Sequence, residues 1–424
     1  MVHLLTNRSF THFVVARMIL NLGKKVSWVA LGWFVYQLTG LATAIGIVIS
    51  AATIAPLISS ILVGGVLDQL NRRTLMIIEN LVRGLLVSMI PVLYWMDLLS
   101  LSIIIGIVFI NGLLSSITEI GSTTILPSFV KEHELQNANA IMSMTGQIGF
   151  LAGPAIGGYF TAFFGAPLTL FIDVLFFFLA SFLYFLIPDS IFNRGLDQTQ
   201  VGLSFKESMN KFFEDTKVGF KFLVRHRSLI MIACVTSVFN VTYALLEPVL
   251  PVFVGEFLNA GPSTLGLFWT IFAIGSLLGS LIWVRTKIRW NYSHSLGVVI
   301  FLWGLAPLTF SFFTNEYIVY FIMFLGGIVY APYNIVEPTL EQQLIPGHLR
   351  GRVIGVIGLI AGMGFPLGTY VGGLLGENIG AANTILVSGI TTVILGIIVF
   401  QHNALKFTSE SIKKDANLKY DSYI

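Results

Sequence analysis

Charged residues are scarce in this sequence. Of its 424 residues, 11% are Asp, Glu, Lys or Arg and 55% are hydrophobic, and the mean hydropathy is +0.84. Because a soluble domain carries roughly 25% charged residues, this composition indicates a chain built for lipid. The net charge of +3 is too small to indicate a nucleic-acid partner. The single cysteine, Cys234, excludes a disulfide within the chain, and no Cys/His group has zinc-ligand spacing. We therefore expect neither a metal nor a cofactor.

Catalytic and nucleotide-binding motifs are missing as well. The sequence contains no His-Glu-x-x-His, no Gly-x-Ser-x-Gly and no Gly-x4-Gly-Lys-Ser/Thr. We therefore expect neither an enzyme nor an ATP-driven pump. A channel is an alternative that sustained single-channel current would support. The N-terminus lacks a short apolar core followed by a small-residue cleavage site, so we expect it to be retained.

Long apolar runs are what the sequence has in abundance. A transmembrane helix needs about 20 mainly apolar residues. Polar residues, Gly and Pro separate the apolar runs and predict twelve such spans. They lie at 10–38, 42–67, 75–95, 100–127, 136–163, 167–187, 227–256, 263–286, 293–313, 317–344, 350–377 and 381–401. The longest polar interruption divides them six and six. We therefore predict an all-α integral membrane protein with two six-helix bundles and two polar segments. The expected ranges are 1–188 and 227–402 for the bundles, 189–226 for a cytoplasmic linker and 403–424 for a cytoplasmic tail.

Basic residues are distributed unevenly about these spans. Four of the 24 Lys and Arg lie deep within spans, at Arg17, Lys24, Lys25 and Arg83, and the rest lie in loops or at the ends of spans. If both termini are cytoplasmic, the other 20 all fall on the cytoplasmic side and the outer loops carry none. Because loops rich in Lys and Arg stay in the cytoplasm, we predict a multi-pass protein with cytoplasmic termini.

The two halves of the sequence also resemble each other. The stretch LPSFVKEHELQNANAIMSMTGQIGFLAGPAIGGYF enters the fifth span, and IPGHLRGRVIGVIGLIAGMGFPLGTYVGGLLGE enters the eleventh in a similar way. Their prolines, Pro154 and Pro366, are separated by half the chain length. Internal repeats with a substrate site near mid-membrane are typical of secondary transporters.

The loop after the second span reads GGVLDQLNRR. It resembles the major facilitator superfamily signature Gly-x-Leu-x-Asp-Arg-x-Gly-Arg-Arg, which Gly64, Asp68, Arg72 and Arg73 match and three intervening positions do not. The resemblance implies the major facilitator fold, with twelve transmembrane helices in two pseudo-symmetric bundles. It also implies a cytoplasmic gate, in which the acid at a helix end latches onto the paired arginines. The alternative is that Arg72 and Arg73 only set the topology.

The fifth span contains GQIGFLAGPAIGG. This stretch is similar to the Gly-x-x-x-Gly-Pro-x-x-Gly-Gly motif associated with exporters of the superfamily. Small residues at four-residue spacing let helices approach closely, and an internal proline kinks a helix, so plain helix packing is the alternative. The matching residues are Gly149, Gly153, Pro154, Gly157 and Gly158.

Resemblance extends over almost the whole chain. ALGWFVYQLTG and LFIDVLFFFLASF look like the macrolide-efflux and siderophore-exporter branch of the drug:proton antiporters. This implies a monomeric exporter of an amphipathic small molecule (drug, siderophore or related metabolite) in the bacterial plasma membrane, working by alternating access and proton antiport. Asp173 matches a recurrent position of the branch and is expected to be structural, whereas Lys24 stands where the branch often has an acid. A proton-coupled importer of the same fold is the alternative.

Two adjacent lysines lie deep in the first span. If that span begins near Phe10, Lys24 is about 21 Å along the helix, where a charge is expensive. Arg17 and Lys24 share one helix face, and Lys25 is turned by about 100°. We expect Lys24 to couple a proton site to the substrate site.

Carboxylates fall on the helices that would surround these cations. Spans one, four, seven and ten line the central cavity in this superfamily, and Glu119, Glu247 and Glu337 lie in spans four, seven and ten. We expect at least one to exchange protons, with Glu119 the first candidate, and static ion pairs are the alternative. Glu79 and Arg83, four residues apart, are expected to pair locally. The aromatic residues expected on the cavity helices are Trp28, Trp33, Tyr36, Tyr243, Tyr330 and Tyr333.

Overall fold

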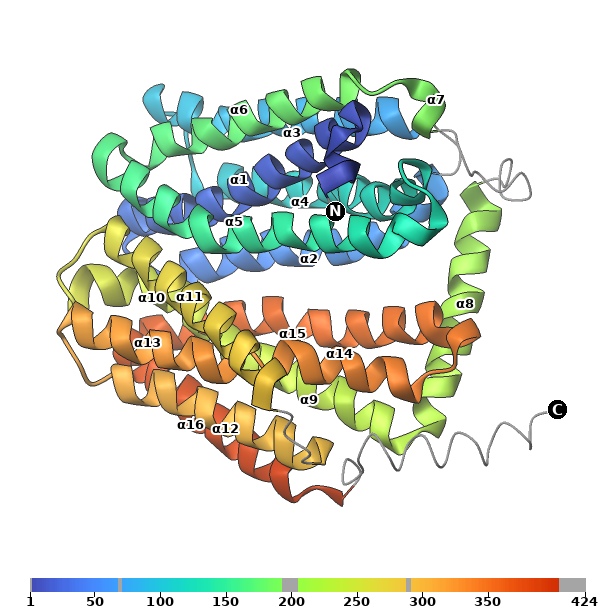
Figure 1. The fold of residues 1–424 in the computed structure, drawn as a ribbon. Coiled ribbons are helices and arrows are strands. Elements are labelled where there is room, and N and C mark those ends of the chain that lie inside the picture. Colours follow the sequence, from blue (N-terminus) through green and yellow to red (C-terminus); the bar gives the residue numbers. More distant parts are fainter. Residues whose placement is uncertain (1, 68–70, 193–204, 287–290, 404–424) are drawn as a thin grey trace. The chain divides into compact units, whose positions relative to one another are not determined.

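The computed structural model describes residues 2–67, 71–192, 205–286 and 291–403, and every regular element in these ranges is a helix (Figure 1). The predicted all-α class is therefore confirmed for the described part of the chain. The longer helices are α1 (Arg8–Thr39), α2 (Ala42–Leu67), α3 (Arg72–Trp95), α4 (Leu101–Ile125), α5 (Leu135–Phe164), α6 (Ala166–Phe185), α8 (Phe205–Arg225), α9 (Arg227–Ala244), α11 (Pro262–Thr286), α12 (Tyr292–Phe310), α13 (Glu316–Tyr330), α14 (Tyr333–Leu344), α15 (Arg350–Ile379) and α16 (Ala381–Gln401). The shorter ones are α7 (Asp189–Phe192), α10 (Leu246–Val252), the 3₁₀ helices Val2–Thr6, Leu126–Ser128, Glu132–Glu134 and Gly347–Leu349, and the π-helix Phe253–Phe257.

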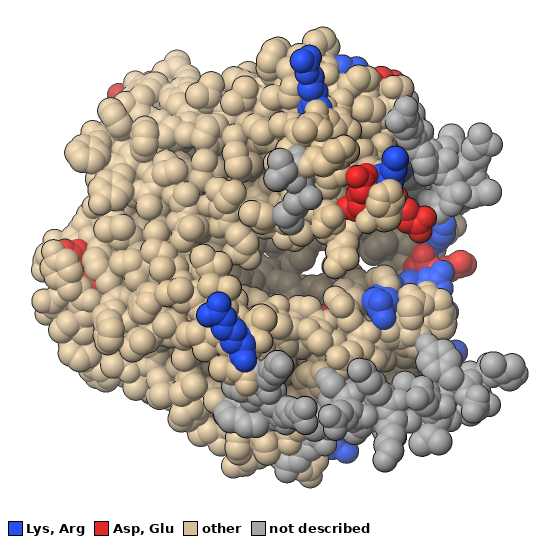
Figure 2. All heavy atoms as spheres, in the orientation of Figure 1, with Lys and Arg blue, Asp and Glu red and all other residues tan. Residues whose placement is uncertain are grey.

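Ten helical segments of the described residues are long and apolar enough to cross a membrane. Helices α1 and α5 also have the length, but α1 carries four cations and α5 is rich in glycine and polar residues. Large apolar side chains such as Phe163 and Val284 are 77% and 70% exposed, as expected for a surface that faces lipid. The face drawn in Figure 2 is mostly uncharged.

The chain forms two compact units. Unit 1 comprises residues 1–212 and 254–270, and unit 2 comprises residues 213–253 and 271–424. In unit 1, α1 packs against α5 and α6, α2 packs against α4, and α3 packs against α4 and α6. In unit 2, α9 packs against α15 and α16, and α12 packs against α13 and α16. Helices α1 and α9 thus each lie against a long glycine-rich helix, α5 and α15 respectively.

Local signals explain where the first helix begins and ends. The Asn7 side chain accepts hydrogen bonds from the backbone N–H groups of Ser9 and Phe10, at 3.1 and 3.4 Å, and so caps the start of α1. Gly40 ends α1 in the left-handed conformation, with φ at 68°. The 32 residues between these caps span about 48 Å, which is more than enough to cross a bilayer.

The segments that the sequence predicts as repeats have similar local structures. Helices α5 and α15 each have 30 residues, contain a proline, and are preceded by a 3₁₀ turn. Each ends at a glycine with positive φ, 81° at Gly165 and 86° at Gly380, from which the next helix starts directly. Only glycine adopts this conformation without strain.

A helix occupies most of each range predicted as a span, but two of these ranges are interrupted. The predicted seventh span breaks at Leu245 into α9 and α10, and the tenth breaks at Ala331 and Pro332 into α13 and α14. Prolines near both breaks account for them, because a proline lacks the N–H that continues a helix. The polar interruption at 189–226 also contains a 21-residue helix, α8.

Candidate functional site

An ion pair joins α1 to α4 in the interior of unit 1. The Nη2 atom of Arg17 lies 2.7 Å from the Oε2 atom of Glu119. The side chain of Arg17 is only 11% exposed, whereas that of Glu119 is 49% exposed. The pair therefore has one buried partner and one accessible partner, so the carboxylate is open to a second cation, to water or to a ligand.

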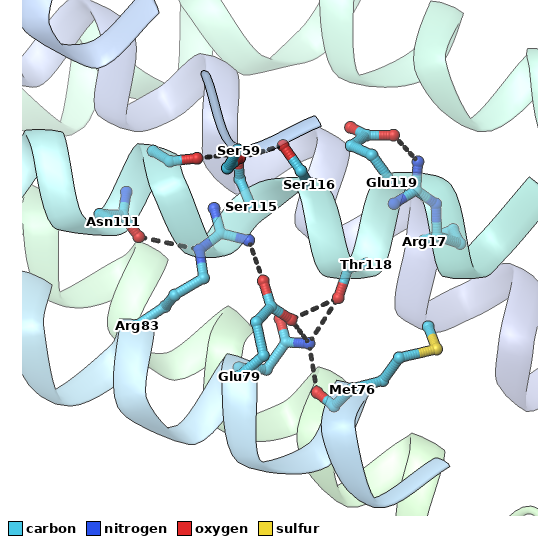
Figure 3. A network of polar contacts seen from close by, with 12 residues as sticks. Arg17, Ser59, Met76, Glu79, Arg83, Asn111, Ser115, Ser116, Thr118 and Glu119 are labelled. Carbon is cyan, nitrogen blue, oxygen red and sulfur yellow. Dashed lines mark hydrogen bonds and ion pairs between the residues drawn. The ribbon is translucent and has the colours of Figure 1, made fainter. Parts of the chain in front are cut away.

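A second, deeper pair lies between α3 and α4 (Figure 3). The guanidinium of Arg83 donates to Glu79 at 2.8 Å and to the side-chain oxygen of Asn111 at 2.8 Å. Glu79 also accepts from the Thr118 hydroxyl and, at 2.7 Å, from the Asn80 amide. The predicted local pairing of Glu79 with Arg83 is confirmed. Because several donors surround this buried carboxylate, its charge is well compensated.

The two lysines of α1 have different surroundings. Lys24 is exposed and lies within electrostatic range of Glu119. Lys25 is half-buried, and its ammonium lies 5.1 Å from the ring centroid of Phe150 on α5. The structure thus brings Arg17, Lys24 and Glu119 together and directs Lys25 toward a different helix. The coupling role of Lys24 stays a prediction.

The glycines of the exporter motif lie where α5 meets its neighbours. A Cβ atom added at Gly149 would lie 2.7 Å from the Asn21 carbonyl oxygen, and one at Gly157 would lie 2.6 Å from that of Val26. At Gly153 it would lie 2.4 Å from the Cβ atom of Lys25. These three glycines therefore let α1 approach α5 at backbone distance.

The last glycine of the motif contacts a different segment of unit 1, the start of α11. A Cβ atom at Gly158 would lie 2.6 Å from the carbonyl oxygen of Pro262 and 2.9 Å from the Cα atom of Gly266, both on α11. Conversely, a Cβ atom at Gly266 would lie 2.3 Å from the carbonyl oxygen of Pro154. The motif thus packs α1 on one side and the start of α11 on the other.

The proposed gate motif is described only in part. Gly64 lies in α2, Arg72 and Arg73 begin α3, and Asp68 lies outside the described residues. Arg73 donates to the backbone carbonyl oxygens of Tyr184 and Phe185, at the C-terminal end of α6. A cation at this end of a helix is favourable, because unpaired carbonyls and the helix dipole make it negative.

The two remaining candidate carboxylates belong to unit 2. Glu337 on α14 accepts a hydrogen bond from the Thr236 hydroxyl at 3.4 Å, and the Tyr333 hydroxyl donates to the oxygen of Thr236 at 3.0 Å. Glu247 is 8% exposed and lies two residues after the helix break at Leu245. Broken helices at polar residues are typical of transporter binding sites.

Aromatic side chains cluster in unit 2. The ring centroids of Tyr243 and Tyr330 are 6.2 Å apart, and those of Tyr330 and Tyr333 are 6.0 Å apart. Trp303 lies 5.8 Å from Tyr243 and 5.5 Å from Tyr330. In unit 1, the rings of Trp33 and Tyr36 meet edge to face at 5.3 Å, and Trp28 is half-buried on α1.

Comparison with known proteins identifies the family. The model of the transmembrane secretion effector family, within the major facilitator superfamily, matches residues 3–421. The chain belongs to this family.

Named relatives of this transporter include pumps and a siderophore transporter. It is 26% identical to the multidrug efflux pump Tap of Mycolicibacterium fortuitum over 384 residues, which cover 89% of this chain and 91% of that one. It is 23% identical to the staphyloferrin A transporter of Staphylococcus aureus, with 92% and 95% of the two chains covered. These relatives are membrane transporters, and the chain is a multi-pass transporter of small molecules rather than an enzyme.

Solved structures show the same fold. The nucleoside transporter NupG superposes with a TM-score of 0.70 at 15% identity, over 93% of this chain and 100% of that one. A bacterial homologue of the iron transporter ferroportin, in an inward-facing state, superposes with a TM-score of 0.71 at 14% identity, over 93% and 98% of the chains. At such low identity, the likeness concerns the fold alone.

Two buried acids of this transporter were not among the predicted site residues. Glu341 lies one helical turn after Glu337 and is 6% exposed, and its four-residue spacing was a readable signal. Asp173 on α6 is 4% exposed and accepts a hydrogen bond from the Ser27 hydroxyl at 2.6 Å. The sequence gives no sign of that contact, because the two residues are 146 positions apart.

Proposed function

We propose that this family member exports an amphipathic small molecule, namely a drug, a siderophore or a related metabolite. It works by alternating access of twelve transmembrane helices in two pseudo-symmetric six-helix bundles, as a monomer in the bacterial plasma membrane with both termini cytoplasmic. Proton entry drives export. The alternative is a proton-coupled importer. The fold does not decide between export and import, because solved structures with this fold include transporters of other substrates.

The geometry of the exporter motif is the observation that carries this proposal. Four glycines of α5 bring two different segments of unit 1 to backbone distance, α1 at three positions and the start of α11 at one. The motif is therefore more than an isolated packing patch on one helix pair. The names of the relatives, a multidrug efflux pump and a siderophore transporter, support the same substrate classes.

The side chains of the two units suit an amphipathic substrate and proton exchange. The aromatic cluster of unit 2 offers apolar faces with polar hydroxyl tips. The half-exposed Glu119, held by Arg17 and within range of Lys24, is a carboxylate whose protonation nearby cations would control. Glu247 and Glu337 remain further proton-exchange candidates.

Ethidium, a fluorescent amphipathic cation, provides a test of direction. Cells expressing the protein should accumulate less ethidium than cells carrying an empty vector, and a protonophore should abolish the difference. Proton-independent uptake of ethidium would support the importer instead. Equal accumulation in both strains would contradict the drug-export proposal. In that case, a deletion strain that still releases its siderophore into the medium at the normal rate would also contradict the siderophore proposal.

A further inference from the structure

One buried acid of unit 1 has no role in the site described above. Asp173 faces α1 from α6 and is 4% exposed. Its Oδ2 atom accepts a hydrogen bond of 2.6 Å from the Ser27 hydroxyl. Its Oδ1 atom is buried and has no hydrogen-bond partner among the described residues. Oδ1 points at the backbone of Gly23, where an added Cβ atom would lie only 2.4 Å away. Helix α1 therefore encloses this carboxyl group closely.

The cations near Asp173 are engaged elsewhere. Helix α6 packs against α1, α3 and α5. On α3, Arg83 binds Glu79 and stacks on the ring of Phe177 at 4.4 Å, so it acts on Asp173 only from a distance.

The other two helices supply no ion pair to this carboxyl group. On α1, Arg17 binds Glu119, Lys25 lies over Phe150, and Lys24 is exposed. Helix α5 contains no charged residue. Among the described residues, no cation forms a salt bridge with Asp173, whereas Glu79 and Glu119 each have one.

Burial without a cation decides the charge of this side chain. A buried carboxylate with one hydroxyl donor loses its hydration without adequate compensation, and this disfavours the charged form. A proton removes the charge and with it this penalty. We propose that Asp173 is a proton-binding site of the transporter, distinct from the Arg17–Glu119 pair, in which the protonated carboxyl group stays hydrogen-bonded to the Ser27 hydroxyl.

The exchange reaction is simple. The carboxylic acid donates its proton to water, and a carboxylate is left at the contact of α1 with α6. That contact does not compensate the charge, so release of the proton favours separation of the two helices at Gly23 and Ser27. Proton occupancy is thereby linked to helix packing. The inference rests on the proposed proton antiport for its functional meaning, but the protonation state is testable without transport.

The corresponding helix pair of unit 2 shows that packing alone does not need an acid. Where α16 meets α9, the Ser388 hydroxyl donates to the Thr242 carbonyl oxygen at 2.6 Å. This contact is neutral and uses a serine and a backbone group. The acid at the α1–α6 contact is therefore better explained by proton binding than by helix packing.

Infrared spectroscopy of the full-length protein in lipid vesicles tests the proposal. At neutral pH, the wild-type minus Asp173→Asn difference spectrum should contain one carboxylic-acid C=O band. The double variant Glu79→Gln/Arg83→Met is the matched control, because Glu79 is equally buried but ion-paired, and it should remove a carboxylate band instead. Ser27→Ala should keep the carboxylic-acid band and move it to higher frequency. Loss of carboxylate bands only in Asp173→Asn would overturn the proposal. If that variant does not fold, an unchanged spectrum in Ser27→Ala would overturn it.

Ethidium flux in proteoliposomes then tests the link to transport. Asp173→Asn should retain ethidium exchange down its own gradient and lose its acceleration by a pH gradient. If a pH gradient still accelerates ethidium flux in Asp173→Asn, Asp173 does not couple protons to transport. Absence of any ethidium flux in the wild type would instead contradict drug export as the proposed function, and the infrared result would still decide whether Asp173 holds a proton.

Discussion

The buried pair of Glu79 and Arg83 gives a residue-level test of charge compensation. Their side chains are 1% and 12% exposed, so removal of one partner leaves an unpaired charge in the interior. We predict that Arg83→Met lowers the free energy of unfolding by about 3–5 kcal/mol. The double variant Glu79→Gln/Arg83→Met should recover much of this loss. Thermal unfolding in detergent measures both, and equal stability of the single and double variants would contradict compensation.

The two adjacent lysines are expected to respond differently to neutralisation. Lys24 is exposed and acts electrostatically on Glu119, so we predict that Lys24→Gln changes the pH profile of ethidium transport. Lys25 lies over the Phe150 ring, so Lys25→Gln should lower the free energy of unfolding by about 0.5–2 kcal/mol and leave the profile unchanged. The check is a pH series in proteoliposomes. A wild-type profile in Lys24→Gln would mean that this lysine does not influence a proton site.

For single residues, the sequence could predict a contact only when the two residues lie close together along the chain. The Glu79–Arg83 pair was predictable because residues four apart on a helix are neighbours. The contacts of Arg17 with Glu119 and of Ser27 with Asp173 join different helices, 102 and 146 positions apart. Their geometry follows from how whole helices pack, and a single sequence does not contain that information.

Among the elements, the approach of α1 to α5 depends on glycines that can be tested one by one. A Cβ atom at Gly157 would lie 2.6 Å from the Val26 carbonyl oxygen, whereas one at Gly146 on the same helix would meet nothing within 4 Å. We predict that Gly157→Ala costs about 1–3 kcal/mol of stability and reduces ethidium efflux. Gly146→Ala is the matched control and should behave like the wild type. Equal effects of the two variants would show that helix propensity, rather than close packing, governs this face.

The positions of the helices were largely readable from the sequence, and their interruptions were not. Runs of about 20 apolar residues mark the helices well because lipid demands them. Prolines near Leu245 and Ala331 permit a break there, but whether the helix breaks also depends on how neighbouring helices satisfy the freed backbone groups, which hydropathy does not report. Helix α8 was missed because its apolar residues alternate with charged ones. It is held by Gly219 against α15 and by an ion pair of 2.7 Å between Asp215 and Arg352.

For the whole molecule, the distribution of basic residues makes a topology prediction that one reagent can check. The positive-inside rule places the turn between α12 and α13 outside and the 3₁₀ turn before α15 inside. Both turns offer exposed positions, Thr314 and His348, for a single cysteine. The native Cys234 is exposed and would be replaced by alanine first. In intact cells, a membrane-impermeant maleimide should then label Thr314→Cys and should label His348→Cys only after permeabilisation. The reverse labelling pattern would contradict the predicted topology and place both termini outside. Labelling of both sites in intact cells would contradict the prediction that α13 and α14 together cross the membrane once.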